Sequence, residues 1–214
     1  MQKKHLIWDL PLRIFHWLFA LTIAGAWYTS EYSSDFIEYH MMLGYFALGL
    51  LTFRISWGIV GPKHARFSQF IPSFKALISY LKCIKQNKKH YSPGHNPLGA
   101  LMVILMIVLI ALQSVSGLFI DDDVFSSGPY YGSVAPEIEK IMSFLHHNLF
   151  DLMIISIIFH LSAIAYYWKI KKENLILPMI TGKKNANKVN ESDAISSSRI
   201  PLAICIVIAT IFFV

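Results

Sequence analysis

Charged residues and cysteines are scarce in this chain of 214 residues. Asp, Glu, Lys and Arg make up 15% of the sequence, against about a quarter in typical soluble domains, and 55% is hydrophobic. The two cysteines, Cys83 and Cys205, lie far apart in unlike surroundings, so they offer neither a CxxC metal motif nor a disulfide framework. The chain has no CxxCH sequence, which excludes covalent attachment of a haem. This composition predicts a small integral membrane protein.

Four long apolar segments predict an all-α fold, a four-helix transmembrane bundle. We expect the first segment to be a retained membrane helix and not a cleaved signal peptide, because Asp9, Arg13 and His16 interrupt it. The last residues, 200–214, are also apolar but give only about 22 Å of helix. They favour a fifth membrane helix, with a tail buried in one leaflet as the alternative. The four expected spans cover residues 10–28, 39–60, 96–120 and 141–168.

Two segments outside the spans are polar. Residues 61–97 contain apolar side chains at helical spacing, which indicates either an amphipathic helix along an anionic membrane surface or a solvated loop with one packed face. Residues 183–199 have little apolar content and predict a flexible linker between a membrane domain, 1–182, and the apolar segment 200–214. The helically spaced residues are Phe74, Leu77, Ile78, Leu81 and Ile84.

The distribution of charge predicts the topology. If the N-terminus is cytoplasmic, all 19 lysines and arginines except Lys140 fall at or beside the cytoplasmic face, as the positive-inside rule requires. The acidic connections, 31–38 and 121–139, then lie outside. This pattern accounts for the net charge of +6 without a nucleic-acid partner. The expected location is a membrane that the chain crosses several times, with the N-terminus on the cytoplasmic side.

Four histidines fall within the spans at two depths. His146 and His160 are fourteen residues apart, which on a helix is about 21 Å of rise and within about 40° of one face. With the predicted topology, His16 is level with His160 near the inner face, and His40 is level with His146 near the outer face. His147 points roughly 140° away from His160, so His146 is the preferred member of the outer pair.

Two imidazoles that meet between helices can hold a transition metal or can be the two axial ligands of a haem. A zinc or copper site usually needs a third or fourth donor, and none is evident at either depth. Arg13 and Arg54, near the inner ends of the first two spans, suit the propionates of a haem, although both can equally be topology-setting charges. The glycines that would give a haem room are Gly25, Gly44, Gly49 and Gly117.

Several motifs resemble one known family, the bacterial cytochrome b561 and nickel-iron hydrogenase cytochrome b subunits. The resemblance covers most of residues 8–184 but not the polar segment and apolar tail that follow. It implies a four-helix core that binds b haems through histidines of the first, second and fourth helices, which agrees with His16, His40, His146 and His160. The motifs are WDLPLRIFHW (8–17), HMMLGY (40–45), RISWGIVGPKHARF (54–67), GHNPLGALMV (94–103), the paired histidines, and NLILPMITGKK (174–184).

The resemblance implies electron transfer through two non-covalent haem b groups between membrane quinone and an extracytoplasmic partner. That partner would be a c-type cytochrome or a dehydrogenase or hydrogenase subunit. Bis-histidine ligation leaves no open position on the iron, so no residue is assigned a catalytic role. His95 either contacts a propionate or quinone or merely begins the third helix. The acidic residues Asp121 to Asp123 either dock a basic partner or are ordinary solvated charges.

Two other classes of function remain as alternatives. One is a membrane transporter or metal-handling protein that uses the same histidines. The other is a structural anchor of a redox complex whose haem sites are vestigial. The presence or absence of b-type haem bands discriminates the first alternative, and reduction by quinol discriminates the second.

Overall fold

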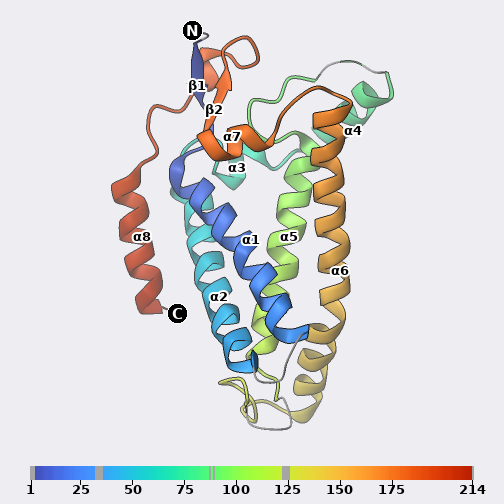
Figure 1. Ribbon diagram of the computed structural model, residues 1–214, viewed down its shortest axis with the longest axis vertical. Helices are drawn as coiled ribbons and strands as arrows, with labels where there is room; N and C mark the ends of the chain where they lie inside the picture. The colour runs from blue at the N-terminus through green and yellow to red at the C-terminus, as the bar shows by residue number, and fades with distance from the viewer. Residues whose placement is uncertain (1–2, 32–35, 87, 89, 122–125, 214) are drawn as a thin grey trace.

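Four long helices form the bundle of this protein, whose computed structural model describes residues 3–31, 36–86, 88, 90–121 and 126–213 (Figure 1). All four are long and apolar enough to cross a membrane, which confirms the predicted fold class. Helix α1 packs along α2, α5 packs along α6, and α2 also contacts α5. The bounds are Leu10–Glu31 for α1, Ile37–Val60 for α2, Pro97–Gly117 for α5 and Pro136–Lys169 for α6.

Local sequence signals fix where two of these helices begin. The Asp9 carboxylate accepts a hydrogen bond of 2.9 Å from the Leu12 backbone N–H, which is the N-cap interaction, and Pro11 lies in the first turn. Asn96 caps α5 in the same way, through a 2.8 Å bond from the Gly99 N–H. The capped starts of α1 and α5 lie at the same end of the bundle (Figure 1).

That end, here named the basic end, carries the short elements of the fold. Strand β1 (Lys4–Leu6) pairs antiparallel with β2 (Lys183–Asn185), so the two extremities of the bundle domain meet there (Figure 1). Helix α4 joins the group and buries only Tyr80 of its residues. The remaining bounds are Phe67–Phe70 for α3, Phe74–Lys85 for α4, Ile176–Thr181 for α7 and Glu191–Asp193 for the 3₁₀ helix η2.

Residues 183–199 differ from the flexible linker that their composition predicts. Val189 is 2% exposed and Ile195 is 9% exposed, so both pack into the protein. Asp193 pairs with Lys63 at 2.8 Å, and the Ile195 N–H donates to the backbone oxygen of Leu6. A few apolar side chains and long-range polar contacts thus fold this segment over the basic end.

Helix α8 (Ile200–Phe213) leaves this cover and runs beside α2, outside the four-helix bundle (Figure 1). A Cβ at Gly49 would lie 4.0 Å from Thr210 Cγ2, so Gly49 faces α8 and not the interior of the bundle. The 14 residues of α8 correspond to about 21 Å of helix. The predicted fifth membrane segment is therefore an apolar helix shorter than the other four.

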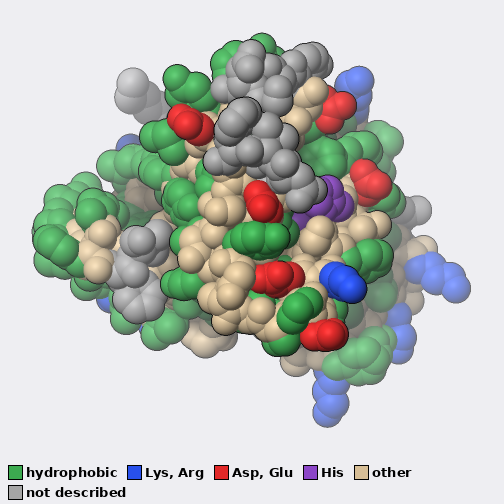
Figure 2. Space-filling model, turned by 90° about the horizontal axis from the view of Figure 1, so that it is seen from below, with side chains coloured by type: hydrophobic (Ala, Val, Ile, Leu, Met, Phe, Trp, Pro, Cys, Tyr) green, Lys and Arg blue, Asp and Glu red, His purple; other side chains and the backbone are tan. Residues whose placement is uncertain are grey.

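The opposite end, here named the acidic end, holds the connections from α1 to α2 and from α5 to α6. Figure 2 looks onto it and shows scattered acidic side chains, with a histidine also reaching the surface. Asp121 pairs with Ser127 in an isolated β-bridge. The predicted acidic residues Asp35, Asp122 and Asp123 lie outside the described residues.

Candidate functional site

His40 of α2 and His146 of α6 face each other near the acidic end. Their ring centres are 6.1 Å apart, and their planes cross at 85°. The Nδ1 atom of His40 lies 2.8 Å from the backbone oxygen of Ala26, and that of His146 lies 2.9 Å from the backbone oxygen of Gln113. Because a carbonyl only accepts, each Nδ1 carries the proton and each Nε2 keeps a free lone pair. This acidic-end pair therefore presents two nitrogen ligands with fixed tautomers.

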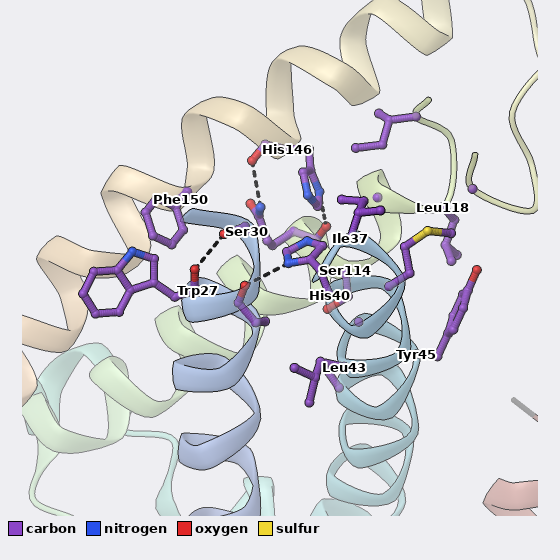
Figure 3. Close-up of a pocket in the computed structure, with 18 of the residues that line it drawn as sticks. Trp27, Ser30, Ile37, His40, Leu43, Tyr45, Ser114, Leu118, His146 and Phe150 are labelled. Atoms are coloured by element: carbon purple, nitrogen blue, oxygen red, sulfur yellow. Dashed lines mark hydrogen bonds between the residues drawn. The ribbon is translucent and has the colours of Figure 1, made fainter. Parts of the chain in front are cut away.

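A cavity of about 430 Å³ surrounds the acidic-end pair. Figure 3 shows the two imidazoles between α1, α2, α5 and α6, with Trp27, Leu43 and Phe150 among the apolar side chains around them. The volume is typical of a site that encloses an organic cofactor. Gly44 lines the cavity, and a Cβ there would meet no atom within 4 Å. The side of Gly44 is thus open toward the space that a flat ligand would fill.

Helix α5 forms the seat of His146. A Cβ at Gly117 would lie 2.9 Å from His146 Cε1, which is closer than side-chain atoms tolerate. Gln113 holds the same histidine twice, since its backbone oxygen accepts from the ring and its side-chain amide donates to the His146 backbone oxygen at 2.7 Å. The sequence predicted Gly117 as one of the glycines that leave space for a haem. It did not predict the role of Gln113, because that role depends on contacts with another helix.

The second pair, His16 of α1 and His160 of α6, lies nearer the basic end. Their ring centres are 6.5 Å apart, and their planes cross at 53°. The Nδ1 atom of His16 is buried and has no hydrogen-bond partner among the described residues. The structure thus brings together both pairs of histidines that the sequence placed at common depths.

A cluster of buried polar groups, here named the basic-end cluster, adjoins this pair. Asp9 and Trp57 are both 0% exposed, and the indole N–H donates to the Asp9 carboxylate at 2.9 Å. Arg54 is 1% exposed, and its guanidinium lies 4.6 Å from the centre of the Phe67 ring. Its Nη1 atom and the second carboxylate oxygen of Asp9 lack partners within the described part of the chain. A pair of unsatisfied buried groups of this kind suits a site that holds a polar ligand.

His95 completes the basic-end cluster from the start of α5. Its ring lies edge-on to Trp8 at 4.7 Å and packs on Phe70 at 4.9 Å. The residue as a whole is partly exposed, but Nδ1 is buried without a partner in the described structure. Burial, reinforced by the positive charges of Arg54 and Lys184, lowers the pKa of His95 to about 3. His95 is therefore neutral at pH 7 and able to donate or accept one hydrogen bond.

The remaining predicted site residues take separate positions. One Nη of Arg13 donates to the backbone oxygen of Ile180, while its Nε is buried and unpartnered among the described residues. His147 is exposed, and its Nδ1 bonds to the Ser143 backbone oxygen within α6. Sequence reasoning missed Arg66, whose Nε is likewise buried and without a partner in the described ranges. Three arginines thus direct nitrogen atoms into the basic end.

The spacing of the rings in each histidine pair is close to that of two imidazoles bound to one metal ion. A metal–imidazole bond of about 2 Å places the centres of two opposed imidazoles about 6.3 Å apart. The observed values of 6.1 and 6.5 Å agree with this spacing. In the described ranges no group of three or more His, Cys, Asp and Glu side chains comes together, and a haem needs only two protein ligands. The bundle and its histidines define a membrane b-type cytochrome.

Comparison with known proteins places this class in a family. Residues 7–182 match the family model described as prokaryotic cytochrome b561, and the chain belongs to that family. Its function is therefore electron transfer in a membrane, with haem b as the cofactor. The match ends before β2, so the cover formed by residues 183–199 and helix α8 lie beyond it.

Curated relatives extend over most of the chain. A protein of Rhizobium leguminosarum bv. viciae is 24% identical over 83% of this chain and 87% of its own length. A protein of Azotobacter chroococcum mcd 1 is 26% identical over 82% of this chain and 86% of its own length. Both are named probable Ni/Fe-hydrogenase B-type cytochrome subunit. No solved structure matches the chain significantly.

Proposed function

We propose that this protein binds two haem b groups and carries electrons across the bilayer between quinone or quinol and an extracytoplasmic redox partner. His16 and His160 would ligate one iron, and His40 and His146 the other. The observation that carries the proposal is the separation of 6.5 and 6.1 Å between the rings of the two pairs. Fourteen residues of α6 separate the pairs, which is about 21 Å along the helix, so the two sites lie toward opposite membrane faces.

The protein's own residues would hold these groups and set their environment. When bound, a bis-histidine haem takes up and releases single electrons and offers no open position on its iron. Arg13, Arg54 and Arg66 would bind the propionates at the basic end, because each has a buried nitrogen without a partner in the described structure. At the acidic end, the carbonyls of Ala26 and Gln113 would keep the ligand histidines in the Nε2-binding tautomer.

The orientation is proposed from charge. Within the described ranges, every lysine and arginine except Lys140 belongs to the basic end or to segments beside it, which supports a cytoplasmic basic end and N-terminus in a bacterial inner membrane. Electrons would then move between a cytoplasmic-side haem at His16 and His160 and an external-side haem at His40 and His146.

Quinone exchange is proposed for the basic end. His95 supports this assignment, because it is neutral, belongs to the basic-end cluster and has a buried Nδ1 unpartnered within the described residues. The alternative is that His95 Nδ1 forms a hydrogen bond with a haem propionate. The unpartnered oxygen of Asp9 would accept a hydrogen bond from a hydroxyl group of a quinol.

The external partner is proposed from the relatives. Because these are named as hydrogenase cytochrome subunits, we favour a hydrogenase subunit over a c-type cytochrome or another dehydrogenase. The partner would dock at the acidic end, next to the cavity of the acidic-end pair. The identity of neighbouring genes would support one of these partners directly.

A reduced-minus-oxidised visible spectrum of the purified protein tests the proposal. Sharp b-type bands and two haems per chain are expected, and His160→Ala should remove one haem while leaving the acidic-end pair intact. A spectrum without haem bands would refute the cytochrome and favour a transporter or metal-handling protein. Titration with a quinol tests the substrate separately, since bands that dithionite reduces but quinol does not would contradict the quinone assignment alone.

A further inference from the structure

Helix α4 (Phe74–Lys85) presents an apolar stripe that no part of the described protein covers. Phe74 is 77% exposed, Leu81 is 45% exposed and Ile78 is 38% exposed. At 100° per residue, these three side chains lie within about 60° of one another around the helix. Ser73 caps the helix by accepting from the Ala76 N–H, so α4 is a defined amphipathic helix and not an irregular loop.

Two lysines flank the stripe on one side, and a third ends it in the last turn of the helix. Lys82 lies about 40° and Lys75 about 60° from the edge of the stripe, whereas Lys85, in the last turn, lies in line with the stripe at its C-terminal end. All three are exposed. An apolar stripe with a row of lysines beside it is the pattern of helices that lie in the headgroup layer of an anionic membrane.

The attachment of α4 sets its depth. Tyr80 is 4% exposed and its hydroxyl lies 2.8 Å from that of Tyr167, two residues before α6 ends at Lys169. Tyr167 also accepts a hydrogen bond from Asn96, the residue that caps α5. Tyrosines and tryptophans gather at the membrane–water interface, and Tyr166, Tyr167 and Trp168 mark that level on α6. Through Tyr80, α4 is therefore held at the level where headgroups begin.

The same attachment determines which way the stripe faces. Tyr80 lies about 130° around the helix from the centre of the stripe, so the side that binds the bundle is far from the side that bears Phe74, Ile78 and Leu81. We propose that α4 is an interfacial helix that inserts this stripe among the acyl chains at the basic end and binds acidic phospholipid headgroups through Lys75, Lys82 and Lys85. Between the two interpretations that the sequence allowed for residues 61–97, the exposed stripe favours the membrane surface.

The proposal concerns lipid and is independent of haem and quinone. Its test uses the full-length protein with Cys83→Ser and Cys205→Ser, a spin label at Leu81→Cys, and bilayers of phosphatidylcholine with or without half phosphatidylglycerol. The measured quantity is the ratio of two collision rates of the spin label, one with oxygen, which dissolves in lipid, and one with a nickel chelate, which stays in water. Ser79→Cys, exposed but off the stripe, is the matched control, and Phe74→Cys gives a second position on the stripe.

The label at 81 should favour oxygen severalfold over the label at 79 in bilayers with phosphatidylglycerol. Lys75→Gln with Lys82→Gln should reduce that preference, and high salt should do the same in the protein with native lysines. Equal exposure of both labels to the nickel chelate would refute membrane insertion. A label at 81 that is shielded from both reagents would indicate a protein partner instead, and an identical result in pure phosphatidylcholine would refute the role of acidic lipid.

Discussion

Gly117 of α5 lies directly against the imidazole of His146 of α6. A methyl group at position 117 would approach His146 Cε1 to 2.9 Å and Nδ1 to 3.2 Å. The hydrogen bond of 2.9 Å from His146 Nδ1 to the Gln113 backbone oxygen holds the ring in this position. The orientation of this proposed ligand is thus set by a helix that contributes no ligand itself.

Gly117→Ala should therefore disturb the acidic-end haem selectively. We expect the haem content to fall from about two per chain toward one, because a displaced His146 no longer opposes His40. Haem-to-protein ratios and redox titration of the remaining bands measure the effect. Gly99→Ala, in the same helix but with its nearest contact at 3.4 Å, is the control and should keep both haems. If Gly117→Ala leaves the haem content and the redox potentials unchanged, then the contact with Gly117 does not set the orientation of His146.

His146 and His147 can be separated by substitution. Both histidines line the cavity, but His146 lies against His40, whereas His147 is exposed and its Nδ1 donates to the Ser143 backbone oxygen in its own helix. His146→Ala should remove one haem and the low-spin signal of that site. His147→Ala should retain both haems. The reverse outcome, measured by haem content and low-temperature spectra, would reassign the ligand.

The hydrogen bond between Asp9 and Trp57 should contribute to stability. Asp9→Ala removes the N-cap of α1, which should lower the free energy of unfolding by about 1 kcal/mol. It also leaves the buried indole N–H without a partner, which should lower it by about 1–3 kcal/mol more. Trp57→Phe removes one donor and keeps the cap, so it should cost less. Denaturant unfolding in detergent gives both values. The double variant should lose less than the sum, because the two residues share one interaction; strict additivity would show that the bond contributes nothing.

The positions of the four paired histidines could be predicted because they depend on local pattern. Helical periodicity relates His146 to His160, and the alternation of spans gives His16 and His40 their depths. Their roles as ligands stay a prediction. The N-cap role of Asp9 could also be predicted, because an acidic residue directly before an apolar segment with proline in its first turn is typical of a helix start.

Other features could not be predicted because they depend on residues far apart in the sequence. Trp57 reaches Asp9 across 48 positions, and Asp193 reaches Lys63 across 130. The segment 183–199 reads as disordered by composition, yet Val189 and Ile195 supply enough burial to hold it over the basic end. No local propensity encodes these contacts, since each needs the bundle to form first.

The pKa of His95 predicts a loss of stability in acid. Burial, then Arg54 and Lys184, lower this pKa to about 3 in the folded protein, against about 6.5 in an unfolded chain. Above pH 6.5 the residue is neutral in both states and has no effect. As the pH falls from about 6.5 toward 3, only the unfolded state binds the proton, so the free energy of unfolding decreases.

We therefore expect His95 to contribute a loss of about 1 kcal/mol per pH unit below pH 6.5, so that His95→Gln should lose less stability than the wild type between pH 7 and pH 5. The unfolding free energy in detergent at the two pH values gives the comparison. His90→Gln, at an exposed histidine of the same end, is the matched control and should follow the wild type. If His95→Gln and the wild type lose equal stability on acidification, then His95 is not held neutral by its surroundings.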